Sequence, residues 1–333
     1  MSLVISRTPF RVSFFGGGTD YPAWYRREGG AVLSTTIDKY CYITARYLPP
    51  FFPTCHRIVW SHIEAVSSIG EILHPAVREG LRMFGYDDAR GVEVHHQGDL
   101  PARTGIGTSS AFAVGLIAAL NALRDAPPLS RTRLFEMALD LEQQRLHDPV
   151  GSQDQVASAV GGFNRIDFAP SGEITVTPVR ASASRIEALQ SNLLLFYTGS
   201  SRLSASVTGE LIANLDRRAE VLREMHAMVD DAVALVQGEG DIEDFGRMLD
   251  HTWRLKRSLS SGISTSVIDD VYTAARKHGA LGGKLLGGGG TGFMLFYVPK
   301  DRQKSLLKAM SPLLHVPFRF ESKGVVLLKN GDL

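Results

Sequence analysis

Strand-like and helix-like segments of this 333-residue chain are grouped in blocks, and this order limits its possible folds more than any other feature. A protein built from βαβ units alternates the two kinds of segment along the chain. Here β-rich stretches come first, two helical patterns follow, and the second half holds a strand, three helices and two more strands. The grouping therefore predicts the α+β class. The expected strands are 4–5, 10–14, 32–37, 40–47, 92–96, 193–197, 293–298 and 325–328, and the expected helices are 111–123, 131–147, 203–236, 245–259 and 266–278.

Local patterns refine three of these segments. Asp38 and Lys39 separate two β-rich stretches and predict a hairpin turn there. Residues 111–123 are small and apolar throughout, which predicts a buried helix, whereas 131–147 has the single apolar stripe of an amphipathic helix. Glycine turns at 161–162 and 170–172 predict another pair of short strands beside them.

Length and charge limit the organisation and the partners of the chain. A length of 333 residues fits two domains, and the small, polar stretch near 180–190 predicts a division into residues 1–185 and 186–333. The 36 basic and 35 acidic residues leave a net charge of +1, which argues against a global electrostatic attraction to nucleic acid or an anionic membrane. Two cysteines cannot build a disulfide framework or a cysteine zinc site.

Hydrophobic runs in the chain are short. The longest purely apolar-plus-glycine run, 111–120, is far below the roughly 20 residues that a membrane-spanning helix needs. The first ten residues lack the basic region and apolar core of a signal peptide. The sequence therefore predicts a cytoplasmic protein.

The segment 99–110, which leads into the helix at 111–123, is the most informative for function. Gly105 and Gly107 permit a curled backbone, and a helix start supplies unpaired N–H groups with a positive dipole end. Together they predict an anion cradle suited to phosphate. The alternative is an ordinary helix capped by one of the hydroxyl groups that follow. The cradle is not a Walker A loop, because no segment has the required G-x-x-x-x-G-K-[ST] pattern.

A second glycine-rich segment, 284–292, contains a literal G-x-G-x-x-G formed by Gly287, Gly289 and Gly292. The dinucleotide fingerprint needs a helix after the glycines, but the strand-like residues 293–298 follow here. A Rossmann dinucleotide site, and with it an oxidoreductase, is therefore disfavoured. The glycines are better explained by backbone that packs close to a ligand or to another loop.

Three acidic residues have the type and setting of functional groups. Asp20 follows a strand and a glycine turn and can accept hydrogen bonds from sugar hydroxyls, or it simply forms the turn. Glu142 lies beside a core-facing position of its helix, where a carboxylate is unfavourable unless it pairs or binds metal. It suits a Mg²⁺ ligand, with an ion pair to Arg145 or Arg103 as the alternative, and Asp154 suits a general base. The ten histidines show no metal-binding spacing.

Three segments together resemble the motifs of the GHMP small-molecule kinases, in matching order and over nearly the whole chain. They are the strand–glycine–acid segment 7–21, the Pro-x-x-x-Gly-Ile-Gly-Thr-Ser-Ser loop 101–110 and the Gly-Gly-Gly-Gly-Thr-Gly loop 287–292. The resemblance implies a two-domain fold with an N-terminal domain of the ribosomal S5 domain 2-like type and a C-terminal α/β sandwich of the ferredoxin-like type. It also implies ATP and Mg²⁺ as cofactors.

The resemblance implies roles for individual residues. Asp154 is then the general base. Arg11 stands where many relatives have a lysine near the transferred phosphate, and it can bind phosphate but cannot act as a base. Ser109 and Glu142 are the expected Mg²⁺ ligands. The implied ATP-phosphate loop consists of Gly105, Ile106, Gly107, Thr108, Ser109 and Ser110. The implied substrate residues are Asp20, Thr19, Gly17, Gly18, Gly289 and Gly290.

Within this superfamily the motifs are most similar to those of bacterial D-glycero-D-manno-heptose 7-phosphate kinases. That similarity implies phosphorylation of the anomeric C1 hydroxyl of this sugar phosphate, a step toward nucleotide-heptose and surface polysaccharide. L-Fucokinases and galactokinases share parts of the motif set, although 16–18 are glycines where galactokinases have Gly-Glu-His. Other sugars (L-fucose, galactose or a hexosamine) and a non-catalytic sensor of sugar and ATP are the alternatives.

A phosphorylated sugar needs cations away from ATP. The candidates are Arg7, Arg11, Lys256, Arg257 and Lys284, each of which also suits a solvated surface position. The expected partners are a small-molecule sugar phosphate and ATP, without nucleic acid or membrane, and a homodimer is left open.

Overall fold

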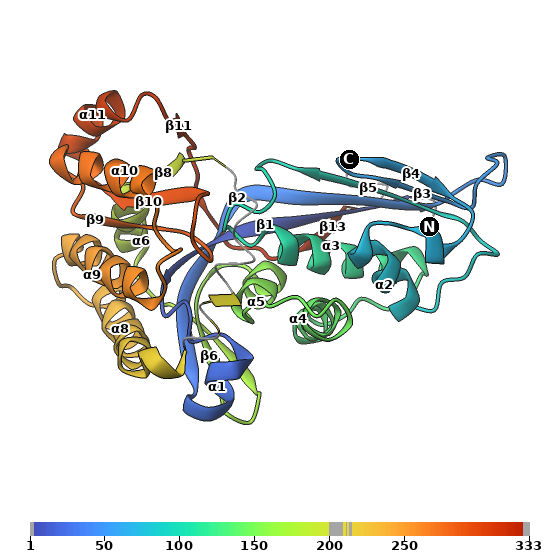
Figure 1. Ribbon diagram of the computed structural model, residues 1–333, viewed down its shortest axis with the longest axis horizontal. Coiled ribbons are helices and arrows are strands. Elements are labelled where there is room, and N and C mark those ends of the chain that lie inside the picture. The colour runs from blue at the N-terminus through green and yellow to red at the C-terminus, as the bar shows by residue number, and fades with distance from the viewer. Residues whose placement is uncertain (1–2, 200–208, 211, 213–214, 329–333) are drawn as a thin grey trace.

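The computed structural model describes residues 3–199, 209–210, 212 and 215–328, which form two β-sheets and the helices around them (Figure 1). The larger sheet contains β1 (Val4–Phe15), β2 (Gly30–Tyr47), β3 (His56–Val59), β4 (Ile63–Val66), β5 (Val92–Gly98), β6 (Phe163–Phe168), β7 (Ile174–Pro178), β12 (Phe320–Glu321) and β13 (Val326–Leu328). The smaller sheet contains β8 (Leu193–Tyr197), β9 (Gly282–Leu285), β10 (Phe293–Tyr297) and β11 (Leu314–His315). Most strand pairs are antiparallel, so the predicted α+β class is confirmed.

The helices form two groups, one alongside the larger sheet and one toward the end of the molecule that holds the smaller sheet (Figure 1). The helices of the first group are α1 (Pro22–Glu28), α2 (Pro75–Met83), α3 (Thr108–Leu123), α4 (Arg131–Leu139) and α5 (Gln153–Val160), with the short turns η1 (Ile69–Glu71) and η2 (Asp140–Arg145). The second group contains α6 (Ala183–Gln190), η3 (Asp216–Arg218), α8 (Ala219–Gln237), α9 (Glu243–Leu259), α10 (Ser266–Lys277) and α11 (Lys300–Ala309). In the described residues, no helix has the length and apolar character needed to cross a membrane.

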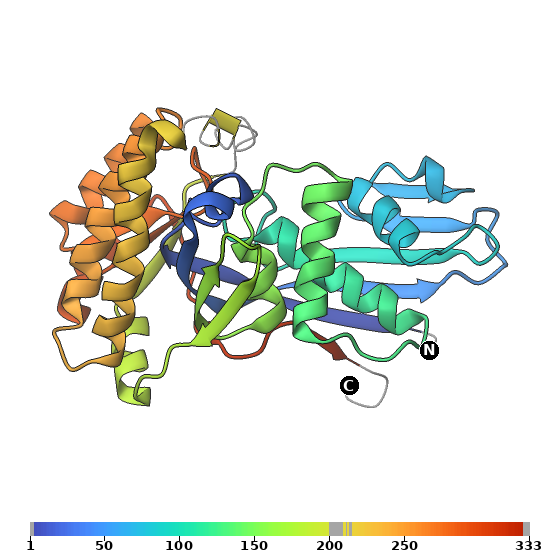
Figure 2. The same cartoon turned by 90° about the horizontal axis from the view of Figure 1, so that it is seen from below.

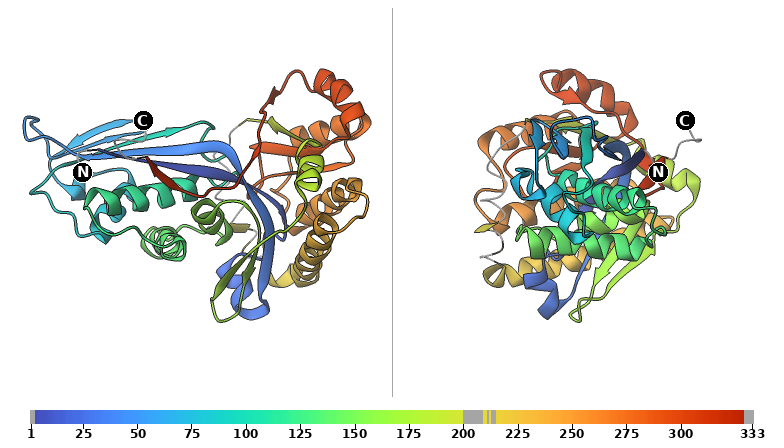
Figure 3. Two further views of the ribbon diagram at one scale, coloured as in Figure 1. Left: turned by 180° about the vertical axis from the view of Figure 1, so that it is seen from behind. Right: turned by 90° about the vertical axis from the view of Figure 1, so that its right-hand side faces the viewer.

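The long strand β2 is continuous, so the hairpin predicted at Asp38 and Lys39 is wrong. β1 pairs along most of one edge of β2, and β6, β12 and β5 pair with successive parts of it. The Asp38 N–H donates to the carbonyl oxygen of Arg319 at 2.9 Å, so the polar pair joins a ladder with a distant segment. Figure 3 shows β1 and β2 running along the larger sheet and bending toward the smaller one.

The helix α3 forms the centre of the first core. It packs on β1 and β2, and every residue from Ser110 to Leu123 is buried, which confirms the buried helix predicted from the sequence. Gly115 allows the close approach, because a Cβ atom there would lie 2.7 Å from Thr8 Oγ1. The apolar helix therefore fixes where its own N-terminus meets the end of β1.

The predicted helix 131–147 is interrupted. α4 ends at Leu139, and η2 continues with the wider π-type hydrogen bonding, seen in the Leu146 N–H that donates to Leu141 O at 3.0 Å. Such π-turns are rare and are frequently found at functional sites. This one contains Glu142, which is 1% exposed. The amphipathic stripe of the first part is as expected, with Leu134 and Ala138 buried.

In the second half, α8 and α9 pack side by side, and α9 also packs on β9 and β10 (Figure 2). α8 begins at Ala219, so its described part is shorter than the predicted helix 203–236, of which 203–208, 211 and 213–214 lie outside the described residues. Its predicted apolar stripe is buried, as Leu222, Met225 and Val229 show.

The last strands return to the larger sheet. β12 pairs with β2, and β13 pairs with β1, although both follow the smaller sheet in the chain. The division predicted between residues 185 and 186 falls within α6. The two sheets therefore do not divide the chain into two continuous segments, and a domain description has to assign residues 320–328 to the first sheet.

Candidate active site

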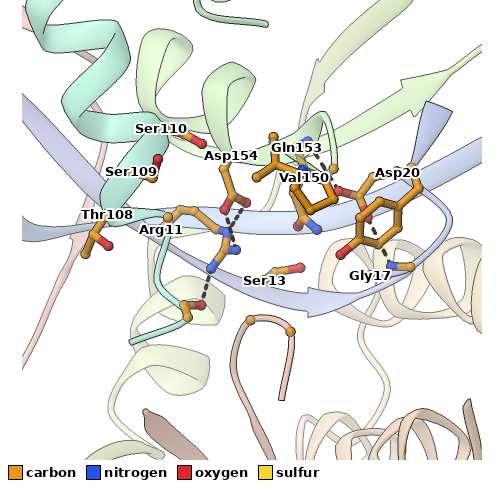
Figure 4. A pocket seen from close by; sticks show the side chains of 18 of the residues that line it. Arg11, Ser13, Gly17, Asp20, Thr108, Ser109, Ser110, Val150, Gln153 and Asp154 are labelled. Atoms are coloured by element: carbon orange, nitrogen blue, oxygen red, sulfur yellow. Dashed lines mark hydrogen bonds and ion pairs between the residues drawn. The ribbon is translucent and has the colours of Figure 1, made fainter. Parts of the chain in front are cut away.

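A pocket of about 250 Å³ lies where the two halves of the molecule meet (Figure 4). Its walls come from the end of β1, the start of α3, the start of α5, α9 and the loop after β9. The sequence-predicted residues that line it are Arg11, Gly17, Gly18, Asp20, Gly105, Gly107, Thr108, Ser109, Ser110 and Asp154.

The loop before α3 has the curled backbone that its glycines predicted. Gly105 and Gly107 have φ angles of +81° and +74°, in the left-handed region that glycine favours. Gly105 is also packed against the other glycine loop, because a Cβ atom there would lie 2.3 Å from Leu286 O. The two glycine-rich segments, about 180 residues apart in the sequence, therefore meet at one edge of the pocket.

The start of α3 carries no side-chain cap. Its N-cap residue is Gly107, so the expectation that a hydroxyl of residues 108–110 caps the helix is wrong. Thr108 Oγ1 accepts from the Arg103 N–H at 3.1 Å instead, and the two serine hydroxyls donate elsewhere. The first N–H groups of the helix consequently face the pocket without side-chain acceptors, which favours the anion cradle over the capped-helix alternative.

The carboxylate of Glu142 lies behind this helix start. It accepts hydrogen bonds from Ser109 Oγ at 2.5 Å, Ser110 Oγ at 2.7 Å and Gln155 Nε2 at 2.6 Å. Burial raises the pKa of Glu142 to about 7, against the lowering effect of these three donors. The alternative ion pair with Arg145 is wrong, since Arg145 contacts Asp140. Glu142 is therefore tied to the helix start by both serines.

Arg11 and Asp154 form a two-pronged ion pair at the centre of the pocket (Figure 4). Arg11 Nε donates to Oδ1 of Asp154 at 2.6 Å, and Nη2 donates to Oδ2 at 2.8 Å. The remaining guanidinium nitrogen, Nη1, donates to Gly105 O at 2.8 Å. Arg11 is almost fully buried, whereas the Asp154 side chain is 23% exposed. The pair thus fixes the carboxylate in orientation and leaves it accessible from the pocket.

Asp20 lines the pocket on the side away from Thr108 and Ser109 (Figure 4), and it is also a turn residue. Its Oδ1 accepts from the Gly18 N–H at 3.0 Å, and its Oδ2 accepts from the Gln153 N–H at 3.4 Å. Burial, and to a smaller extent the charge of Asp154, raises the pKa of Asp20, against the lowering effect of these hydrogen bonds. Gly151 makes room for this carboxylate, because a Cβ atom there would lie 2.0 Å from Asp20 Oδ2.

Besides Glu142, which lies behind the start of α3, four of the sequence-predicted residues do not line the pocket. The hydroxyl of Thr19 lies in the protein interior within hydrogen-bond distance of Gly16 O and Ala31 O, and its one hydrogen can be donated to either. Ile106 is fully buried and accepts the Arg11 N–H with its carbonyl oxygen. Gly289 and Gly290 lie beyond the part of the loop that reaches the pocket, which Gly287 and Gly288 line instead.

Of the five basic residues that are candidates for binding a substrate phosphate, three line the pocket and two do not. Arg11, Lys256 and Lys284 line the pocket. Arg257 pairs with Asp269 at 3.0 Å, and the Arg7 guanidinium lies over the ring of Tyr40. Arg7 and Arg257 are therefore set aside as phosphate ligands.

Ser13 and Gln153 also line the pocket, although the sequence predicted no role for them. Ser13 Oγ and Gln153 Oε1 are buried side-chain atoms without a hydrogen-bond partner within the described residues. Buried polar groups normally have partners, so these atoms are suited to bonds with a ligand. Strand alternation offered a signal for Ser13, which lies two residues after Arg11 and so on the same face of β1.

Two parts of the chain match the N-terminal and the C-terminal models of one protein family. Residues 71–162 match GHMP kinases N terminal domain, and residues 228–311 match GHMP kinases C terminal. Together these segments cover more than half of the chain. It therefore belongs to the GHMP kinases, as its three motifs predicted, and is a kinase that uses ATP.

Several individual GHMP kinases are similar to this chain over most of its length. The chain is 26% identical over 319 residues to D-glycero-alpha-D-manno-heptose 7-phosphate kinase of Campylobacter jejuni, covering 93% of this chain and 94% of the relative. It is also 26% identical to L-fucokinase/L-fucose-1-P guanylyltransferase of Bacteroides fragilis, covering 91% of this chain but 35% of that protein. The structure of a D-glycero-D-manno-heptose 1-phosphate kinase from Bacteroides thetaiotaomicron has the same fold, with a TM-score of 0.80, 22% identity and coverage of 98% and 99%. The two-domain GHMP kinase fold expected from the motifs is therefore confirmed.

Proposed function

We propose that this kinase transfers the γ-phosphoryl group of ATP to the anomeric C1 hydroxyl of D-glycero-D-manno-heptose 7-phosphate. The product would serve nucleotide-heptose and surface-polysaccharide synthesis. The observation that carries the proposal is the Arg11–Asp154 pair, which lies beside an uncapped helix start in one pocket. The full-length similarity to a heptose 7-phosphate kinase supports the choice of sugar.

The chemistry follows from the positions of these groups. Phosphoryl transfer depends mainly on positioning and on stabilising charge. The amides at the start of α3 hold the ATP phosphates, and Asp154 accepts the proton of the attacking hydroxyl. Arg11 holds the carboxylate of Asp154 in place and brings a permanent positive charge to the transferred group. The exposed side of Asp154 is where the acceptor hydroxyl binds.

The side chains behind the helix start fit Mg²⁺. Glu142 and Ser109 offer only oxygen atoms, and Mg²⁺ usually binds one or two carboxylates together with substrate phosphates. Among the described residues, no group of three or more His, Cys, Asp or Glu is placed to hold a metal ion by itself. Such an ion would neutralise the charge on the phosphates of ATP.

The sugar side of the pocket has several polar groups. Asp20 lines it with a carboxylate already fixed by backbone amides. Ser13 and Gln153 add a hydroxyl and an amide oxygen that have no protein partner within the described chain. Sugar hydroxyls both donate and accept hydrogen bonds, so this set suits a polyhydroxylated acceptor.

The test is ADP release with Mg·ATP across a panel of acceptors. It contains D-glycero-D-manno-heptose 7-phosphate, D-mannose, L-fucose, D-galactose and N-acetylglucosamine. Selective turnover of the heptose phosphate supports the proposal, and NMR of the product then identifies the phosphorylated hydroxyl. Turnover of a free sugar alone would replace the substrate while keeping the chemistry. Bound ATP without turnover of any acceptor would favour a sensor.

A further inference from the structure

Two buried lysines reach the pocket from the second half of the chain. Lys256 belongs to α9 and Lys284 to β9, and both line the pocket beside Arg11. Lys256 is 8% exposed and Lys284 is 3% exposed. Lysine is almost never buried to this extent unless it is paired, because burying an unpaired ammonium group is strongly unfavourable.

Within the part of the chain that the structure describes, the hydrogen-bond partners of these lysines are backbone carbonyls. Lys256 Nζ donates to Leu285 O at 2.9 Å and to Gly287 O, and Lys284 Nζ donates to Phe14 O at 2.8 Å. An ammonium group has three donors, so both lysines keep at least one donor for a further partner. In residues 3–199 and 215–328, neither lysine forms an ion pair with a carboxylate. Arg11, in contrast, has Asp154 as its counter-charge.

The positive charges lie close enough to affect one another. Burial, followed by the charge of Arg11, lowers the pKa of Lys256 to about 7. The pKa of Lys284 is lowered by burial and then by the charges of Lys256 and Arg11. Asp20 is the acid that opposes these effects on both lysines. The pocket therefore has a local excess of positive charge that a bound anion would neutralise.

The two lysines belong to segments other than the predicted ATP-phosphate loop, although Gly287, one of their anchors, and the neighbouring Leu286 pack against Gly105 of that loop. The lysines come from α9 and β9, and their anchoring carbonyls belong to β9, to the loop after it and to the end of β1. The cradle at the start of α3 uses backbone amides of a different segment. The pocket thus presents two groups of anion-binding donors, and a kinase that acts on a phosphorylated acceptor has to bind two phosphorylated substrates.

We propose that Lys256 and Lys284 form a second phosphate-binding subsite, which takes the phosphate monoester that the acceptor already carries. The inference rests on the proposed function, since it names the groups that recognise a phosphorylated rather than a free sugar. The γ-phosphate of ATP has the same chemistry and is the other source of such an anion. The experiments below distinguish the two sources.

The first experiment measures phosphate binding without turnover. Inorganic phosphate is titrated into the full chain by calorimetry while Mg·AMP-PNP, a non-hydrolysable ATP analogue, saturates the nucleotide site. Lys256→Met and Lys284→Met should each weaken binding about tenfold or more, because each removes a charged donor. Lys277→Met, which changes an exposed lysine of α10, is the matched control and should keep the wild-type affinity. Equal affinities in all four proteins would overturn the subsite.

The second experiment identifies the source of the phosphate. If the subsite serves the acceptor, both variants raise the KM for D-glycero-D-manno-heptose 7-phosphate and leave the KM for ATP unchanged. A rise in the KM for ATP alone would assign the lysines to the γ-phosphate and overturn the acceptor assignment. In the unmodified enzyme, inorganic phosphate should compete with the acceptor and not with ATP, a test that does not depend on the folding of a variant.

Failure of the proposed function remains distinguishable from failure of the subsite. If no sugar of the panel is phosphorylated but the lysine variants lose phosphate binding, the subsite stands and the proposed acceptor is wrong. If the heptose phosphate is turned over and the lysine variants behave as the wild type, the function stands and the subsite is wrong.

Discussion

The ion pair between Arg11 and Asp154 allows activity and stability to be predicted for one substitution, Asp154→Asn. The carboxylate accepts two guanidinium donors, at 2.6 and 2.8 Å. Asparagine keeps one oxygen but places an NH₂ group against the second donor. Neither guanidinium donor then faces a charged acceptor, and Arg11 is left buried without its counter-charge, which corresponds to about 3 to 5 kcal/mol of unfolding free energy. Because the Asp154 side chain is 23% exposed, water replaces part of the loss, so we expect a value of about 3 kcal/mol.

The substitution Asp154→Asn should also lower kcat strongly. An asparagine cannot accept the proton of the acceptor hydroxyl, and loss of a general base typically lowers kcat by about 10²–10⁴-fold. In the proposed mechanism the α3 loop holds the ATP phosphates, so the affinity for ATP should change little. Urea unfolding followed by circular dichroism measures the stability, coupled ADP release measures kcat, and AMP-PNP calorimetry measures the affinity.

Two further variants separate the roles of the pair. Asp167→Asn alters another Arg–Asp pair, formed with Arg165 on β6 outside the pocket, and should leave kcat unchanged. Combining Arg11→Met with Asp154→Asn should destabilise the protein less than the sum of the single changes, because no buried charge is left alone. Wild-type kcat in Asp154→Asn would refute the base role, and strict additivity in the double variant would refute the coupling.

Three other substitutions test the surroundings of the pair. In the absence of metal, Glu142→Gln should remove a pH dependence of the unfolding free energy. The carboxyl of Glu142 has a pKa of about 7 in the native protein and an ordinary pKa of 4.5 in the unfolded chain, so between these values only the native state holds the proton. The unfolding free energy of the wild type therefore falls by about 2–3 kcal/mol as the pH rises through this range. Urea melts of both proteins from pH 5 to 8 measure the slope, and equal slopes would contradict the assignment. Gly151→Ala should raise the KM for the acceptor about tenfold or more, because its Cβ atom would displace Asp20. Gly70→Ala is the control and should leave this KM unchanged, because the nearest atom to its Cβ, Ser68 Oγ, lies 3.8 Å away. Steady-state kinetics with varied acceptor measure both, and equal KM values would contradict the prediction. Ser109→Ala should raise the Mg²⁺ concentration for half-maximal rate about tenfold, and an unchanged Mg²⁺ titration would exclude it as a ligand.

Short-range patterns predicted most of the elements and the functional segments. The strand β8 and the helices α9 and α10 begin or end within two residues of their expected bounds. The phosphate loop was found because glycine and a following apolar helix constrain the backbone locally. Asp20 and Asp154 were singled out by their type and setting, Arg11 was found by the resemblance, and all three line one pocket.

The errors came from interactions between distant residues. Asp38 and Lys39 have the local character of a turn, but β2 runs through them without interruption and pairs there with 319–321. The alternative of a hydroxyl cap at 108–110 was wrong because α3 already begins at Thr108, which leaves Gly107 as its N-cap. No local pattern indicates that Gly287 rather than Gly290 reaches the pocket, since this depends on its packing against Gly105.

The same reasoning predicts that the pocket binds each proposed substrate better when the other is present. Burial raises the pKa of Asp20 and Glu142 and lowers the pKa of Lys256 and Lys284, so every one of these groups is less readily charged inside the protein. A phosphate beside the lysines favours their protonated forms, and a cation beside Glu142 favours its ionised form. Each ligand therefore brings the charge that its side of the pocket lacks. Because Arg11 contacts Asp154 and the Gly105 carbonyl together, the acceptor side and the ATP side share one guanidinium, and binding on one side should favour binding on the other.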